Sequence, residues 1–210
     1  PSSITNLQEI FKSIDILTDP NDKHFKKLVI DSTDKWLVLN DLSFGNITFG
    51  EFEGYMIKQI SNNAFGYASS TIQNFTLYNS LNHDPPNHDI WNVLSRLTDA
   101  KFIRGLFNII EIPSDALKNL SNLKELKIQT LSKTTIRRKA FYNLKNLLIL
   151  DLKIKEIDVE EEAFAFQTRV NPTLGLHFYE NIHQRFDEKA FNGLQGNVDV
   201  AFSNMSIDAI

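Results

Sequence analysis

The chain has no cysteine, no long apolar run and no excess of basic residues. The lack of cysteine excludes disulfide bonds and a thiolate nucleophile. A transmembrane helix needs about 18 or more consecutive apolar residues, and no such run occurs. The net charge is -4, and Lys and Arg are spread along the whole sequence, which predicts no nucleic-acid partner.

Sequence motifs of catalysis are also lacking. The sequence contains no phosphate-binding glycine loop, nucleophile elbow or zinc-protease helix. We therefore expect neither an enzyme nor a bound cofactor or metal. Pro1 is not followed by a basic and then an apolar region, so no signal peptide is expected, and we interpret the sequence as a mature or excised fragment.

The dominant pattern is an apolar spacing that occurs twice between residues 120 and 152. The residues Leu120, Leu123, Leu126 and Ile128 recur 24 residues later as Leu144, Leu147, Leu150 and Leu152. This Leu-x-x-Leu-x-Leu spacing, repeating every 20 to 29 residues, is typical of leucine-rich repeats. Each repeat supplies one short strand that buries a single face only when neighbouring copies stack.

The same spacing extends in both directions and predicts an α/β leucine-rich repeat solenoid. It would have a curved, parallel, concave sheet of about eight strands, with short helices or turns on the convex side. The expected core pairs of the strands are Leu28/Ile30, Phe52/Gly54, Phe75/Leu77, Ala100/Phe102, Leu126/Ile128, Leu150/Leu152, Leu176/Phe178 and Val200/Phe202. Small-plus-large pairs on the convex side are expected at Ala64-Phe65, Ile90-Trp91, Ala116-Leu117, Ala140-Phe141, Ala163-Phe164 and Ala190-Phe191.

Several segments resemble a family of secreted leucine-rich repeat proteins. They read LSFGNITF at 42–49, IKQISNNAF at 57–65, IPSDA at 112–116, NLSNL at 119–123 and AFYNLKNL at 140–147. With these segments the chain resembles the proteins described as similar to the non-catalytic subunit of a luciferin monooxygenase. The resemblance implies a secreted binding or scaffolding module without catalysis.

The chain departs from the usual repeat at the position three residues after the second core residue. An asparagine there normally satisfies backbone groups at the turn, but here the residues are Thr33, Ile57, Ser80, Gly105, Leu131, Lys155, Asn181 and Met205. Buried backbone groups still need partners, so we expect small side chains, water or altered turns, and a less regular solenoid.

We expect one domain over residues 1–210. Residues 1–22 would form an N-terminal helical cap or another convex segment, and 23–210 would form about eight repeats, the last one truncated. Extracellular leucine-rich repeat proteins often close their ends with disulfide caps. Without cysteine, such caps lie outside this sequence or the ends are covered in another way.

Three polar clusters could carry chemistry, and each has a plainer interpretation. His83, Asp84, His88 and Asp89 are metal-ligand types in one loop, but their spacing favours a solvated turn. The acidic run of Asp158 and residues 160–162 could attract a cation, and the basic cluster of Lys133 and residues 137–139 could bind phosphate or an acidic glycan. For both clusters the sequence favours a solvated convex edge or loop over a binding site.

Four acceptor sequences for N-glycosylation are present, at Asn46, Asn74, Asn119 and Asn204. They are compatible with an extracellular location, which the resemblance also implies. A glycan on Asn74 would obstruct part of the concave surface.

The concave face is the candidate binding surface, because strand alternation sends the neighbours of the core pairs there. The expected binding residues are Glu53, Tyr55, Tyr78, Lys101, Ile103, Lys127, Asp151, His177 and Tyr179. The tyrosines suit a protein or peptide ligand, since rigid amphipathic rings supply interface energy at low entropic cost. The other function left open is an accessory, non-catalytic subunit of a secreted hetero-oligomer.

Overall fold

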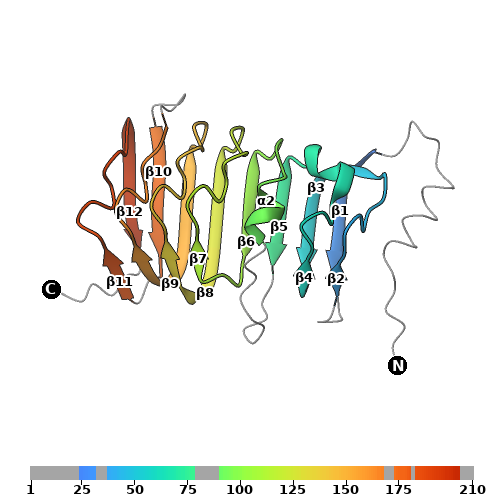
Figure 1. Cartoon of the computed structure of the whole chain (residues 1–210), viewed down its shortest axis with the longest axis horizontal. Helices are drawn as coiled ribbons and strands as arrows, with labels where there is room; N and C mark the ends of the chain where they lie inside the picture. Colours follow the sequence, from blue (N-terminus) through green and yellow to red (C-terminus); the bar gives the residue numbers. More distant parts are fainter. Residues whose placement is uncertain (1–23, 32–36, 79–89, 168–172, 181–182, 204–210) are drawn as a thin grey trace.

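The computed structural model describes residues 24–31, 37–78, 90–167, 173–180 and 183–203 (Figure 1). Within these residues the strands stand side by side in one row, from β1 at one end to β12 at the other. Every strand pairing is parallel. The predicted leucine-rich repeat solenoid is therefore confirmed.

The main sheet follows the order of the chain. Its row consists of β1 (His24–Asp31), β3 (Thr48–Tyr55), β5 (Asn74–Tyr78), β6 (Phe102–Leu106), β8 (Glu125–Ile136), β9 (Ile149–Val159), β10 (Thr173–Tyr179) and β12 (Asn197–Ser203). Four short strands lie off this row: β7 (Glu111–Ile112) pairs with β8, β11 (His183–Phe186) with β9, and β2 (Val38–Leu39) with β4 (Gln59–Ile60). The returning segments include the 3-10 helix η1 (Gly66–Ser70) and the helix α2 (Ile90–Leu94).

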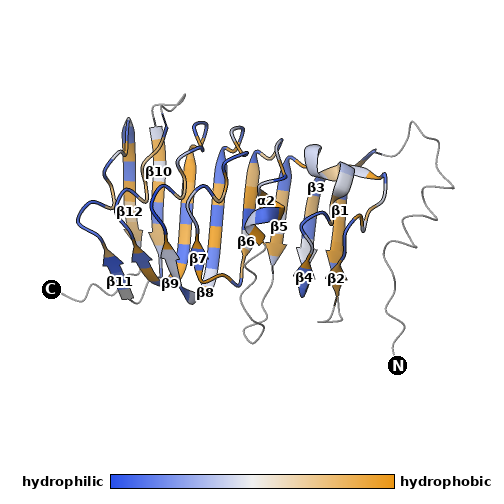
Figure 2. Ribbon diagram, viewed as in Figure 1, coloured by the Kyte–Doolittle hydropathy of each residue, from blue (hydrophilic) through white to orange (hydrophobic). Residues whose placement is uncertain are grey.

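The register places the first core residues of all strands in one column. It runs through Leu28, Phe52, Phe75, Ile103, Leu126, Leu150, Leu176 and Val200. The members from Phe52 to Leu176 are at most 1% exposed. Apolar and polar residues alternate along the strands (Figure 2), as expected when neighbouring repeats cover one face of each strand.

The convex pairs are buried as predicted, apart from the last. Ala140, Phe141, Ala163 and Phe164 are at most 1% exposed. Phe191, in the last repeat, is the exception and is partly exposed. An additional pair, Ser43-Phe44, is also buried and escaped the sequence analysis, because serine stands where alanine was expected.

A left-handed backbone residue precedes several convex pairs and explains the small residue that follows. The φ angles are +55° at Leu42, +55° at Asp115, +58° at Lys139 and +51° at Glu162. Each precedes a serine or alanine directly. A tight turn of this kind brings the chain close to its neighbour, and only a small side chain fits there.

The predicted core pair of the fourth strand was wrong by three residues. Ile103 pairs with Phe75 and Leu126, and Gly105 pairs with Leu77 and Ile128, so these two residues take the core positions. Ala100 is the first apolar residue of the Leu-x-x-Leu-x-Leu spacing in this repeat. The glycine concealed the pattern, because a core position without a side chain does not look apolar in the sequence.

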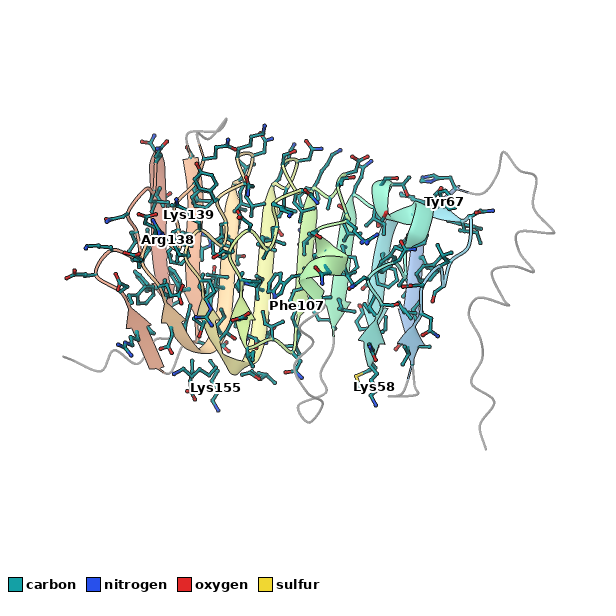
Figure 3. All side chains as sticks on the ribbon, in the orientation of Figure 1. Lys58, Tyr67, Phe107, Arg138, Lys139 and Lys155 are labelled. Atoms are coloured by element: carbon teal, nitrogen blue, oxygen red, sulfur yellow. The ribbon has the colours of Figure 1, made fainter. Side chains whose placement is uncertain are left out.

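Side chains from the following turn fill the space left by the two core glycines. A Cβ on Gly105 would lie 2.3 Å from the Leu77 carbonyl oxygen and 2.8 Å from the Phe107 ring. A Cβ on Gly54 would lie 2.6 Å from Ile57 Cδ1. Phe107, labelled in Figure 3, and Ile57 are both buried. The strand around Gly54 is therefore well packed although one core position has no side chain.

Threonine side chains take over part of the asparagine's task, which confirms the expectation of small polar replacements. Thr130 and Thr134 are buried, and both hydroxyls donate to the Ile109 carbonyl, at 3.4 and 3.3 Å. The register between β8 and β9 shifts between Thr130 and Lys133. With the corrected fourth repeat, Asn108 rather than Gly105 occupies the asparagine position.

Some predictions lie outside the described residues. They concern the N-terminal cap at 1–22, the His/Asp loop at 82–89, Asn181 and the sequon at Asn204.

Candidate functional site

The concave face, defined as the sheet face opposite the core columns, carries two central rows of side chains. The first row consists of Val29, Glu53, Thr76, Arg104, Lys127, Asp151, His177 and Ala201. The second consists of Asp31, Tyr55, Tyr78, Leu106, Gln129, Lys153, Tyr179 and Ser203. Of the nine predicted binding residues, seven lie in these rows.

Lys101 and Ile103 were the two wrong assignments. Ile103 is fully buried in the core. Lys101 precedes β6, and its Nζ donates to Gln73 Oε1 at 2.9 Å. Arg104 and Leu106 take their places on the concave face, a direct result of the shifted pattern in the fourth repeat.

A chain of ion pairs crosses the middle of the concave face. Arg104 Nε lies 2.6 Å from Glu125 Oε1, and Lys127 Nζ lies 3.5 Å from the same oxygen. Lys127 also lies 3.1 Å from Asp151 Oδ2. Burial alone would lower the pKa of Lys127, but the hydrogen bond to Asp151 and the nearby carboxylates outweigh it and raise the pKa.

His177 and Tyr179 extend this network into β10. His177 Nδ1 lies 2.7 Å from Asp151 Oδ1, and the Tyr179 hydroxyl lies 3.2 Å from the same nitrogen. Gly175 makes room for the imidazole, since a Cβ there would lie 3.1 Å from His177 Nε2. These bonds hold both rings in fixed orientations on the concave face.

A tyrosine pair lies toward the N-terminal end of the same face. The rings of Tyr55 and Tyr78 stack with centroids 5.4 Å apart and an interplanar angle of 19°. The Tyr55 hydroxyl donates to Glu53, and this bond raises the pKa of Tyr55 to about 12. Glu53 also pairs with Lys27, and these hydrogen bonds hold the pKa of Glu53 below its ordinary value.

A shallow hollow of 390 Å³ lies beside the tyrosine pair. Its lining comes from β1, β3, β5 and β6 and consists of Lys27, Glu51, Phe52, Glu53, Asn74, Thr76, Tyr78, Phe102 and Arg104. The Arg104 guanidinium lies 5.7 Å from the centre of the Phe102 ring. The hollow thus combines aromatic rings with positively and negatively charged side chains. Phe102 and Arg104 were missed because they follow the shifted pattern.

The basic cluster and the acidic run pair with each other across adjacent repeats. The pairs are Lys133–Asp158 at 2.7 Å, Arg137–Glu160 at 2.6 Å and Arg138–Glu162 at 2.9 Å. Hydrogen bonds from Arg137 and Arg138 lower the pKa values of Glu160 and Glu162. The two charge clusters thus largely neutralise each other. Arg138 and Lys139, labelled in Figure 3, both pair with Glu162. This favours the interpretation of both as solvated edges.

The described sequons differ in their surroundings. Asn46 is exposed in a turn. Asn74 is half-buried at the start of β5, where it lines the hollow. Asn119 is exposed, and its side-chain amide donates to the Ser95 carbonyl at 3.1 Å.

Two features are absent from the described part of the chain. Within it, no group of three or more His, Asp or Glu side chains is placed to hold a metal ion. No helix there has the length and apolar character needed to cross a membrane.

Comparison with known proteins agrees with this architecture. The family model of the BspA type Leucine rich repeat region matches in six copies, over residues 38–168 and 92–203. The structure of a TLR13–ssRNA13 complex superimposes with a TM-score of 0.66 at 20% sequence identity. This match covers 98% of our chain but 28% of the other, and at this identity it shows the fold alone. A search of curated proteins finds no match. With its strand register and a family match over most of its length, the chain belongs to the BspA-type leucine-rich repeat family.

Proposed function

We propose that this chain is a non-enzymatic recognition module that binds a protein or peptide ligand on its concave face. The observation that carries the proposal is the stacked Tyr55–Tyr78 pair beside the 390 Å³ hollow. Stacked rings provide apolar contact area that needs little ordering on binding. The hollow can receive one side chain of a ligand that lies along the sheet.

The ion-pair network supports the same proposal. Arg104, Lys127, Asp151 and His177 are already held by hydrogen bonds, so a ligand does not have to order them. Alternating charges of this kind discriminate between ligands by complementarity.

The charge of the concave face also favours a protein or peptide ligand over a nucleic acid. The TLR13 structure contains ssRNA. Our concave face carries Glu53, Glu125 and Asp151 among its cations, and each contacts a Lys, an Arg or a His. The phosphate backbone of a nucleic acid requires a basic surface whose charge is not neutralised. The concave face does not provide such a surface. A protein or peptide with mixed charges fits it better.

The test is selection of displayed peptides on the immobilised chain, followed by affinity measurement on variants. Replacing Tyr55, Tyr78 and Tyr179 together by alanine should lower the affinity for the selected peptides at least about 100-fold. Each anchoring ring contributes on the order of 1–2 kcal/mol to the binding free energy. Tyr67→Ala is the matched control, because Tyr67 is exposed in η1, away from the concave face (Figure 3). Equal affinity for the triple variant and the parent would refute the proposal, as would tighter binding of single-stranded RNA.

A location outside the cell belongs to the same proposal. The exposed sequon at Asn46 and the resemblance to secreted proteins support it. Expression behind a secretory leader should give a product whose mobility changes on deglycosylation, and Asn46→Gln should reduce this change. An accessory role in a secreted complex is the second candidate; it rests on the resemblance and would show as stable co-purification with a catalytic chain.

A further inference from the structure

Two cations in the middle of the concave face are exposed, while the carboxylates that bind them are nearly buried. The side chains of Arg104 and Lys127 are 47% and 44% exposed, whereas those of Glu125 and Asp151 are 11% and 14% exposed. The surface that a ligand meets at this point is therefore positively charged, although two carboxylates balance the two cations.

Arg104 has hydrogen-bond donors to spare. Its Nε donates to Glu125 Oε1 at 2.6 Å, which is the one hydrogen bond of this guanidinium group among the described residues. In Arg137, by contrast, Nε, Nη1 and Nη2 all donate to Glu111 or Glu160. A guanidinium group has five N–H donors in a planar fork, so the two Nη groups of Arg104 are available to a ligand.

The Arg104 guanidinium is also held in one orientation. The Glu125 carboxylate binds its Nε, and the Phe102 ring lies with its centre 5.7 Å from the guanidinium carbon. Arg104 lines the 390 Å³ hollow beside Thr76, its partner in β5. A guanidinium group fixed in this way binds a carboxylate with little further loss of side-chain entropy.

The other carboxylates of the hollow lie away from Arg104. Glu53 binds Lys27 and Tyr55 on β3, two strands or about 10 Å from β6. Glu51 lies on β3 as well, where it is the strand partner of Lys27. The positive region is therefore small. It fits a single carboxylate, and the acidic side chains beyond it disfavour a row of phosphates.

We propose that Arg104 determines the specificity of the concave face by binding the side-chain carboxylate of an Asp or Glu residue in the ligand through its two Nη groups. An arginine fork and a carboxylate form two parallel, charge-assisted hydrogen bonds. This inference rests on the proposed function, because it names the chemistry of one residue of the proposed peptide ligand.

The composition of the displayed peptides selected on the parent chain is the first test. The peptides should share an acidic position. Glutamine in place of that acid should lower the affinity of the synthetic peptide about 10- to 100-fold, the range expected for one charge-assisted contact. Amidation of the peptide C-terminus should leave the affinity unchanged. Affinity that depends on a free C-terminus and not on the acidic side chain would overturn the proposal.

A double-mutant cycle then assigns the acid to Arg104. Arg104→Gln should lower the affinity for the acidic peptide as much as glutamine in the peptide does, and the two changes together should lower it little further. Arg104→Lys should restore only part of the affinity, because lysine keeps the charge but lacks the fork. Arg137→Gln is the matched control and should bind like the parent, since Arg137 lies beyond the end of β8.

Urea midpoints establish that the variants are folded, and the peptide substitution needs no change in the chain. Additive losses in the cycle would overturn the proposal, and so would selected peptides without a common acidic position. If such peptides still lose affinity on replacement of the three tyrosines, the proposed function stands and only the role of Arg104 is refuted. If no peptide binds, both are refuted.

Discussion

At the scale of single residues, Gly105 shows how a missing side chain can be essential to the packing. The Leu77 carbonyl and the Phe107 ring occupy the space where a Cβ would lie. Gly105→Ala should therefore destabilise the chain by about 1–3 kcal/mol, the usual cost of overpacking a core. The measurement is the urea midpoint followed by circular dichroism.

Gly50→Ala is the control for this substitution. Gly50 is also in a strand, but the nearest atom to its Cβ would be the Lys26 carbonyl oxygen at an ordinary 3.5 Å. Its midpoint should stay close to that of the parent or rise slightly. If Gly105→Ala and Gly50→Ala had the same midpoint, the described packing at Gly105 would be wrong.

The same glycine marks the limit of prediction from the sequence. Seven of the eight core pairs could be predicted. In most of them both positions are apolar, and in Phe52/Gly54 the large apolar residue reveals the pair although the other position is glycine. In the fourth repeat, Ala100 and Phe102 looked more apolar than Ile103 and Gly105. Only the neighbouring strands fix the correct register, through Leu77 and Ile128.

At the scale of secondary-structure elements, ion pairs between the residues that directly follow β8 and those that directly follow β9 link adjacent repeats. Arg137 and Arg138 hold the pKa values of Glu160 and Glu162 below the ordinary 4.5. A lowered folded-state pKa contributes stability at pH values above 4.5, and this contribution is lost as the pH falls through the folded-state values. Acid should therefore weaken the contact between these repeats.

The double variant Glu160→Gln/Glu162→Gln should lose less stability than the parent between pH 5 and about pH 3. Urea midpoints across this range provide the measurement. Glu188→Gln is the control, because the Glu188 side chain is 85% exposed and lies 4.0 Å from Lys189. If the double variant and the parent showed the same pH dependence, the ion pairs would not contribute to folding.

The pairing of the basic and acidic clusters could not be predicted from the sequence. The basic residues 137–139 and the acidic residues 160–162 were both visible in the sequence. The two clusters are about one repeat apart in the sequence. That they lie side by side can be inferred only when the register between β8 and β9 is known. Considered one at a time, the clusters left an anion site and a cation site open beside the favoured solvated edges, whereas the structure pairs the two clusters with each other.

At the scale of the whole molecule, the arrangement of tyrosines carries the functional proposal. Tyr55, Tyr78 and Tyr179 lie in one row of the concave face, as predicted from strand alternation. Their interactions could not be predicted, because the Tyr55–Tyr78 stack and the Asp151–His177–Tyr179 bonds depend on the positions of neighbouring strands.

The most direct measurement is hydroxyl-radical footprinting of the five tyrosines with and without a selected peptide. Tyr67 and Tyr142 lie in the returning segments and serve as internal controls. Bound peptide should reduce oxidation of Tyr78 and of at least one of Tyr55 and Tyr179, and leave Tyr67 and Tyr142 unchanged. Protection of Tyr67 or Tyr142, with the concave tyrosines oxidised as before, would contradict recognition by the concave face.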